Sequence, residues 1–134
     1  MYEVYWKDNK AHGRGRLIHS DGDVYDGEWV NNEMSGRGVM THASGRVYDG
    51  EWSNSACNGH GIMRYPDGGE YNGNWLDSAF SGHGIMTYAE GDVYEGNWLH
   101  DKMHGQGKMT YADGREYNGQ WANDKINGKG KLSN

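Results

Sequence analysis

A single 23-residue pattern runs through the whole chain. The motif Tyr-x-Gly-x-Trp begins at residues 25, 48, 71, 94 and 117, and a degenerate sixth copy, YEVYW, occupies residues 2–6. A fixed period of this length is typical of arrays in which small units stack and each unit packs on its neighbours. The sequence therefore predicts a single array over residues 1–134, with units starting near residues 2, 25, 48, 71, 94 and 117.

The pattern inside each unit has a period of two. Tyr, Gly and Trp of the motif alternate with polar residues, as in YDGEW at residues 25–29. Such alternation is typical of half-buried β-strands. Polar stretches at residues 31–35 and 43–45, and the sequence PDG at 66–68, supply turns between the strands. We expect an all-β fold in which six β-hairpins form one elongated, twisted, single-layer antiparallel sheet.

The chain has few aliphatic residues from which to build a conventional core. Only 34% of its residues are hydrophobic, whereas it contains 23 glycines, 10 tyrosines and 6 tryptophans. Each unit also repeats a Leu or Met, as at Met40, two residues after a glycine pair. These pairs lie at 13/15, 36/38, 59/61, 82/84, 105/107 and 128/130. Because glycine by itself weakens a strand, we expect the aromatic rings to form the core on one face, with both glycines of each pair leaving room for them there.

The consensus unit, Y-x-G-x-W-x6-G-x-G-x-[LM], resembles the MORN repeat (membrane occupation and recognition nexus) over residues 2–132. The glycine that this family usually carries three residues after the tryptophan is absent. The residues at that position are Asn9, Asn32, Ser55, Ser78, Asp101 and Asp124. Asn and Asp tolerate a left-handed turn conformation, whereas for Ser55 and Ser78 we expect a turn of another shape.

The resemblance implies a non-catalytic array that serves binding and assembly. Roles proposed for such arrays divide between protein scaffolding, including self-association, and lipid binding, and a fold does not decide between them. Our leading hypothesis is a scaffold for protein–protein interaction. The alternative is a module that binds phosphoinositide or a membrane surface. A targeting segment of an enzyme is a third interpretation.

The aromatic residues also provide the first candidate site. We expect the tryptophans to be mainly core residues, with the part of each ring that a single-layer sheet leaves uncovered forming an apolar groove. The groove tryptophans are Trp29, Trp52, Trp75 and Trp98, and the residues at its rim are His42, Tyr65, Tyr88 and Tyr111. We predict that an extended or helical segment of a protein partner binds along this groove.

Two further features are relevant to assembly. Apolar residues recur in an otherwise polar stretch, at Met34, Cys57, Phe80, Met103 and Ile126. They either tuck under the hairpins or form a hydrophobic edge. An array also leaves an unpaired strand at each end. Either the chain is part of a longer array or larger protein, or its ends pair with another copy to give a homo-oligomer.

The charge distribution bears on the choice of partner. The net charge is −6, with the acidic residues concentrated in the middle of the chain, so there is no basic stripe for nucleic acid. The candidate lipid contacts of the alternative hypothesis are Arg14, Arg16, Lys129 and Lys131. Four basic residues divided between the two ends of the array predict only modest attraction to an anionic membrane.

The sequence carries no pattern typical of an active site. The glycine pairs recur in every unit and do not open a helix, so they do not indicate a phosphate-binding loop. Cys57 and His60 have C-x-x-H spacing and His83 lies one unit further on. Equivalent residues of adjacent units are about 10 Å apart, too far for one zinc ion. These three residues are therefore candidates only for a metal site shared between two chains. We expect no catalytic residue, no metal site within the chain and no cofactor.

The expected location is cytoplasmic, with association to the cytoskeleton or a membrane surface. The chain has one cysteine, which suits a reducing compartment. It contains no run of apolar residues long enough to span a membrane and does not begin with the pattern of a secretory signal.

Overall fold

The computed structural model describes residues 2–7 and 10–133, and the side chains of residues 13–128 and 130–133. This part of the chain forms twelve β-strands in one antiparallel sheet, and each strand pairs with the strands before and after it in the sequence. The strands are β1 (Tyr2–Lys7), β2 (Lys10–Ile18), β3 (Val24–Val30), β4 (Glu33–Thr41), β5 (Val47–Ser53), β6 (Ala56–Arg64), β7 (Glu70–Leu76), β8 (Ala79–Thr87), β9 (Val93–Leu99), β10 (Lys102–Thr110), β11 (Glu116–Ala122) and β12 (Lys125–Ser133). The expected fold class and the six hairpin units are confirmed.

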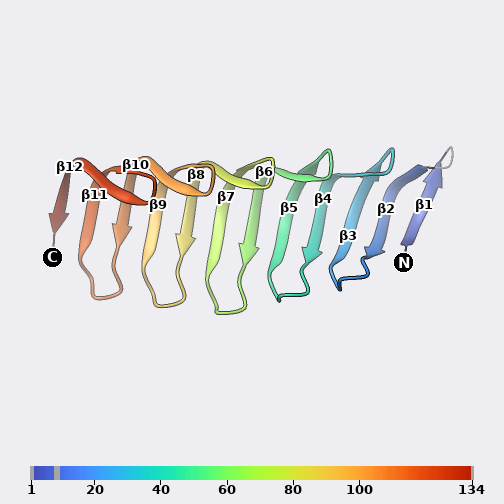
Figure 1. The fold of residues 1–134 in the computed structure, drawn as a ribbon, viewed down its shortest axis with the longest axis horizontal. Helices are drawn as coiled ribbons and strands as arrows, with labels where there is room; N and C mark the ends of the chain where they lie inside the picture. Colours follow the sequence, from blue (N-terminus) through green and yellow to red (C-terminus); the bar gives the residue numbers. More distant parts are fainter. Residues whose placement is uncertain (1, 8–9, 134) are drawn as a thin grey trace.

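Two kinds of connection alternate along the sheet (Figure 1). Two-residue turns join the strands within a unit, as at Asn31 and Asn32, and both residues have positive φ angles of 49° and 70°. Such turns match the right-handed twist of the paired strands. Longer loops join the units, as at residues 42–46, where the Gly45 N–H donates to the His42 carbonyl at 2.9 Å. In the described part of the chain, all two-residue turns lie at one end of the strands and all longer loops lie at the other end (Figure 1).

The prediction for two of the two-residue turns was wrong. Ser55 and Ser78 adopt φ angles of 62° and 66°, in the same left-handed region as Asn32 at the equivalent position. Hydrogen bonds to the preceding hairpin hold them there. The Ser78 N–H donates to the Cys57 carbonyl at 2.9 Å, and the Ser78 Oγ accepts the Cys57 N–H at 3.1 Å. These two bonds compensate the cost of a left-handed serine.

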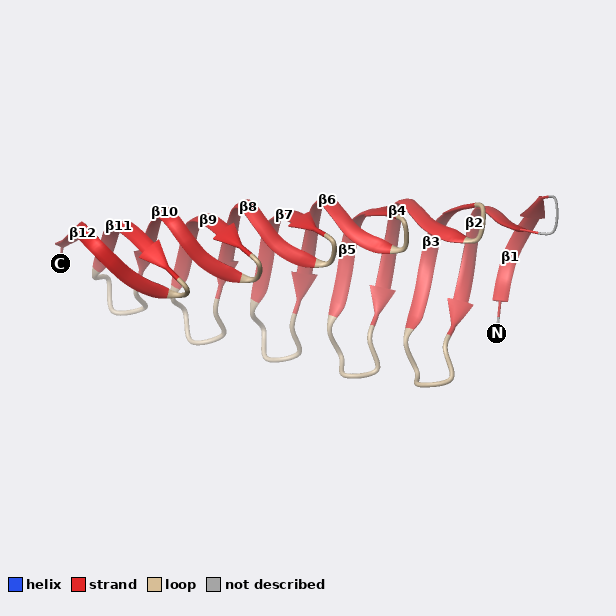
Figure 2. Ribbon diagram, turned by 45° about the horizontal axis from the view of Figure 1, so that its top comes forward, coloured by secondary structure: helices blue, strands red, loops and turns tan. Residues whose placement is uncertain are grey.

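The two glycines of each pair have different structural roles. The expectation that both line the side of the sheet that carries the rings was therefore wrong. Gly36 has a φ of +91° and lies in a bulge between the paired residues Gly27–Gly38 and Trp29–Met34. Three residues of β4, 35–37, stand there opposite the single residue Glu28. A bulge bends its strand. Figure 2 shows the hairpin ends with the two-residue turns curving forward, away from the rest of the sheet.

The second glycine of each pair makes room for a tyrosine, as predicted. A Cβ atom on Gly38 would collide with the ring of Tyr25, and the same holds for Gly61 and Tyr48. Tyr25 and Tyr48 are completely buried. Each tyrosine also packs edge-on against two tryptophans, with ring centroids 5.2 Å apart for Tyr25 and Trp52. The aromatic rings therefore form a continuous core across the repeats on one face, which we call the ring face; the opposite face is the polar face.

No helix in the described part of the chain is long and apolar enough to cross a membrane.

Candidate binding groove

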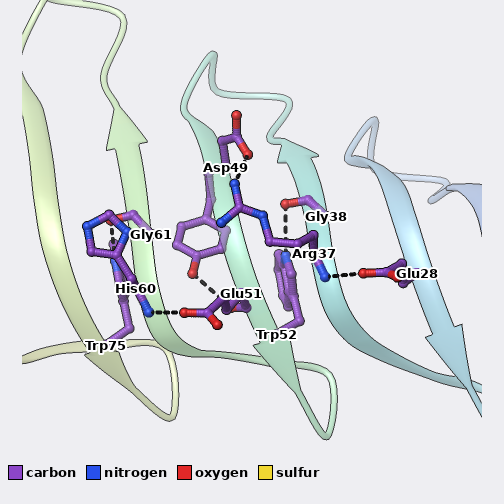
Figure 3. A network of polar contacts seen from close by, with 10 residues as sticks. Glu28, Arg37, Gly38, Asp49, Glu51, Trp52, His60, Gly61 and Trp75 are labelled. Carbon is purple, nitrogen blue, oxygen red and sulfur yellow. Dashed lines mark hydrogen bonds and ion pairs between the residues drawn. The ribbon is translucent and has the colours of Figure 1, made fainter.

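Each of the five tryptophans from Trp29 to Trp121 connects its own repeat to the preceding one. The Trp52 indole Nε1–H donates to the Gly38 carbonyl at 3.1 Å, and Trp75 donates to the Gly61 carbonyl at the same distance (Figure 3). The acceptor is always fourteen residues earlier in the chain. This bond satisfies the polar atom of a buried indole and fixes the ring against the neighbouring strand.

The tryptophans are more deeply buried than the sequence led us to expect. Trp29, Trp52, Trp75 and Trp98 retain only 3–7% of their surface exposed. The reason is the curvature of the even-numbered strands, whose outer ends carry further apolar side chains over the rings. Phe80 of β8, for example, stacks on Tyr71 with centroids 4.0 Å apart and contacts Trp98 edge-on. The indoles therefore support the groove from below, and other residues form its accessible surface.

The residues in this curved segment largely tuck under the hairpins. Cys57, Phe80 and Met103 are buried, with 6%, 9% and 7% of their surface exposed. Met34 is half-buried against the core, while Ile126 in the last strand is 50% exposed. All five lie in strands rather than in the turns where the sequence analysis placed them. The first of the two alternatives, burial under the hairpins, holds for the central repeats.

One wall of the groove follows the strand ends that are joined by the longer loops. It consists of the first residue after each of β4, β6, β8 and β10, and we call it the aromatic wall: His42, Tyr65, Tyr88 and Tyr111. All four side chains are partly exposed, and the three tyrosines pack against the core. The loop backbone holds each residue in place, as where the Tyr65 N–H donates to the Gly69 carbonyl at 2.9 Å.

The other wall follows the strand ends that are joined by the two-residue turns. We call it the turn wall, and its residues are Ser55, Ser78, Asp101 and Asp124. Each side-chain oxygen accepts a backbone N–H of the preceding repeat. For Asp101 the bond is from Phe80 at 2.7 Å, and for Asp124 it is from Met103 at 2.8 Å. These residues were not identified as site residues from the sequence, although their recurrence every 23 residues with an oxygen-bearing side chain was a usable signal.

The two walls face each other across the ring face. Tyr65 and Asp101 lie at opposite ends of the strands. Both nevertheless line one hollow of about 260 Å³ together with Met63 and Phe80. A second hollow of about 270 Å³ shares Met63 with the first and extends toward Met34 and His42. A third, of about 230 Å³, lies between Tyr65 and Tyr88. The curved sheet thus forms a groove that runs along the array.

The charges along the groove are unevenly distributed. Arg46 and Asp101 line the same hollow, and both act electrostatically on Tyr65, whose pKa is raised mainly by burial. The pKa of Tyr88 is raised to about 12, mainly by burial and in addition by the nearby carboxylates of Asp124 and Glu90. The turn wall changes from neutral serines to aspartates toward the C-terminal end. The groove therefore becomes more negative in that direction.

The polar face carries a different set of contacts. The Glu51 carboxylate accepts a hydrogen bond from the backbone N–H of His60 at 2.6 Å, and the Arg37 guanidinium lies 3.7 Å from the Asp49 carboxylate (Figure 3). Further along, His83 lies 3.7 Å from Glu95. These groups are exposed, so their ion pairs contribute little to stability. The polar face is a solvated surface of alternating charge.

The candidate lipid contacts are not all brought together. Arg14 and Arg16 are exposed on β2, and Lys131 is exposed on β12, at opposite ends of the sheet. The Lys129 side chain lies outside the described residues. Arg14 and Arg16 do come together, because both line a hollow on the polar face that also contains Asp26.

The three residues considered for metal binding are also separated. Cys57 is buried beside Trp52, whereas His60 and His83 are exposed. His60 precedes Gly61, whose missing side chain makes room on the ring face, so its own side chain points to the polar face. Burial raises the pKa of the Cys57 thiol to about 11. The described residues hold no group of three or more His, Cys, Asp or Glu side chains that could hold a metal ion.

Comparison with known protein families identifies the repeat. A family model described as MORN repeat matches residues 2–24, 25–45, 48–70, 71–93, 94–114 and 117–133. None of the curated proteins compared with the chain matches it. Among solved structures, the TCP domain of SAS-4 (dCPAP) of Drosophila melanogaster, in complex with a proline-rich motif of Ana2 (dSTIL), is 10% identical, with 91% of this chain and 84% of that chain covered at a TM-score of 0.34. Likeness at this level carries no functional argument.

Proposed function

The chain belongs to the MORN-repeat family, and from this premise we propose that it is a non-catalytic scaffold that binds a segment of a partner protein along the groove. The observation that carries the proposal is the aromatic wall, where Tyr65, Tyr88 and Tyr111 remain partly exposed above a methionine-lined floor. Tyrosine beside apolar surface is typical of protein interfaces, because the ring provides contact area and the hydroxyl a hydrogen bond.

The shape of the groove favours an elongated partner segment over a compact one. Its three hollows follow one another along the array, each shared between neighbouring repeats. An extended strand or a helix can place successive side chains into such a series. We therefore propose that the partner lies parallel to the long axis of the array and anchors apolar side chains in the hollows.

Capture of a partner by wild-type and variant arrays tests this proposal. The groove variant replaces Tyr65, Tyr88 and Tyr111 by Ser. The matched control replaces His60, His83 and Gln106 by Ser, because these exposed residues lie on the polar face of the same three repeats. We expect proteins retained by the wild-type array to be lost from the groove variant and kept by the control. Equal retention by both variants, with both folded by circular dichroism, would contradict binding in the groove.

We further propose that the array self-associates through its outer strands. Ile126 and Leu132 of β12 are 50% and 62% exposed, whereas the equivalent residues Met103 and Met109 are each only 7% exposed. A second chain can cover this apolar edge by adding a strand to the sheet. We expect the sedimentation coefficient to rise with protein concentration and Leu132→Asp to suppress the rise. A monomer at every concentration would contradict self-association.

A further inference from the structure

The fourth residue after each member of the aromatic wall differs between the repeats. These positions hold Arg46, Gly69, Asp92 and Arg115. The Arg115 guanidinium lies over the ring of Tyr111, 5.1 Å from its centroid. At Tyr65 and Tyr88 the equivalent residue is a glycine or an aspartate. The two central tyrosines therefore lack the arginine that covers the last one.

The space between the two central tyrosines has the composition expected of a cation site. Tyr65 and Tyr88 line the hollow of about 230 Å³ together with Met86, Asp67 and Glu90. It thus offers two aromatic rings, an apolar base and two carboxylates within one small volume. A guanidinium group is attracted to an aromatic face and to carboxylates, and it is more weakly hydrated than an ammonium group.

The two carboxylates that line this hollow are not paired with a cation of the described part of the chain. Within the residues that the structure describes, neither Asp67 nor Glu90 forms an ion pair, and the same is true of Asp101 on the turn wall. Asp101 and Asp67 both act on Tyr65, and Glu90 acts on Tyr88, in the direction that disfavours a further negative charge. A positively charged group is the complementary occupant.

We propose that the hollow between Tyr65 and Tyr88 receives an arginine side chain of the partner segment, held by the two rings and by the carboxylates of Asp67 and Glu90. This inference rests on the proposed function of the groove and specifies the chemistry of its partner. The Arg115–Tyr111 contact is the same interaction made within the chain. Arg46 and Arg115, on either side, repel a second cation, so they set the position of the partner arginine at the centre of the groove.

A pair of blocked tripeptides tests the inference without knowledge of the natural partner. The probes are acetyl-Leu-Arg-Leu-amide and the same peptide with citrulline, which keeps the shape of arginine and removes its charge. We expect the arginine peptide to bind about fivefold to tenfold more tightly. In NMR titrations the largest shift changes should fall in residues 65–69 and 86–90. Equal binding of both peptides, or shift changes centred on the polar face around Glu95, would overturn the inference.

Charge-neutralising variants separate this inference from the proposed function. In Glu90→Gln with Asp67→Asn, shape and hydrogen-bonding capacity are preserved, and we expect the preference for arginine over citrulline to fall to about twofold or less. Glu95→Gln is the control, because it removes a carboxylate from the polar face. If the charge variants retain the full preference, the arginine site is wrong while groove binding stands. If the tyrosine-to-serine groove variant also retains natural partners, the proposed function itself fails.

Discussion

At the scale of single residues, a tyrosine and a glycine of adjacent strands fit together. The Tyr48 ring occupies the place where Gly61 would carry a side chain, and its hydroxyl donates to the Glu51 carbonyl at 2.8 Å. The ring is thereby packed against other atoms, and the hydroxyl has a hydrogen-bond partner although it is buried. Close packing of this kind leaves no volume for an additional methyl group.

We predict that Gly61→Ala destabilises the fold by about 2–3 kcal/mol, because the new methyl group collides with the ring of Tyr48. The reference variant is Gly68→Ala, where the space is open and only the backbone φ of +98° opposes alanine. It should cost about 1 kcal/mol. Urea unfolding followed by tryptophan fluorescence measures both. A smaller loss for Gly61→Ala than for Gly68→Ala would show that the ring moves aside.

A second prediction concerns alkaline pH. Burial raises the pKa of Tyr25 and Tyr94 from the ordinary value of 10.0 to about 12. The folded chain therefore holds these protons more tightly than the unfolded chain, so their stabilising contribution is complete below pH 10 and is lost as the pH rises through about 12. Parallel titrations of tyrosinate absorbance and circular dichroism should show late ionisation together with unfolding. Full ionisation near pH 10 in a folded protein would contradict the prediction.

At the scale of the elements, the two-residue turns that contain Ser55, Ser78, Asp101 and Asp124 are each bonded to the hairpin before them. In two repeats a serine Oγ accepts a hydrogen bond from a backbone N–H of the preceding hairpin, at 3.1 Å. In two others an aspartate oxygen accepts the equivalent bond, at 2.7 and 2.8 Å. A charged acceptor makes the stronger hydrogen bond, and aspartate is also more tolerant of the left-handed conformation.

We therefore predict that Ser78→Asp stabilises the array by about 0.5–1 kcal/mol. Ser20→Asp introduces the same charge in an exposed loop and serves as the control, for which we expect a change within about 0.5 kcal/mol. Thermal unfolding of the two variants beside the wild type provides the measurement. If both variants change stability equally, general electrostatics rather than the turn contact is responsible.

The strands were predictable from the sequence because Tyr, Gly and Trp repeat with a period of two, and the role of Gly38 followed from the same pattern. The bulge at Gly36 was not predictable, since a positive φ angle leaves no trace in a hydrophobic pattern. For the groove, the sequence identified the aromatic wall but not the turn wall. Asp101 lines the groove only because the sheet curves, and the curvature follows from the bulge.

At the scale of the whole molecule, the strands of each described repeat pair only with each other and with the strands of the repeats beside it. Stability is then close to a sum of repeat and interface contributions. We predict that deletion of residues 48–70 leaves a folded, shorter array with a lower unfolding midpoint, because Tyr71 then directly follows Val47 in the same register. Deletion of residues 48–59 brings unlike strands together and should abolish cooperative unfolding. Circular dichroism with urea titration distinguishes the two results, and similar behaviour of both deletions would contradict the additive description.

The bond from each indole to a carbonyl fourteen residues earlier gives the array a direction. As the chain leaves the ribosome, each new tryptophan meets an acceptor that has already been made, so a hairpin can dock before the rest of the protein has been translated. We expect nascent chains arrested at 23-residue increments to gain protease resistance one hairpin at a time, and protection that appears only at full length would rule out such vectorial folding.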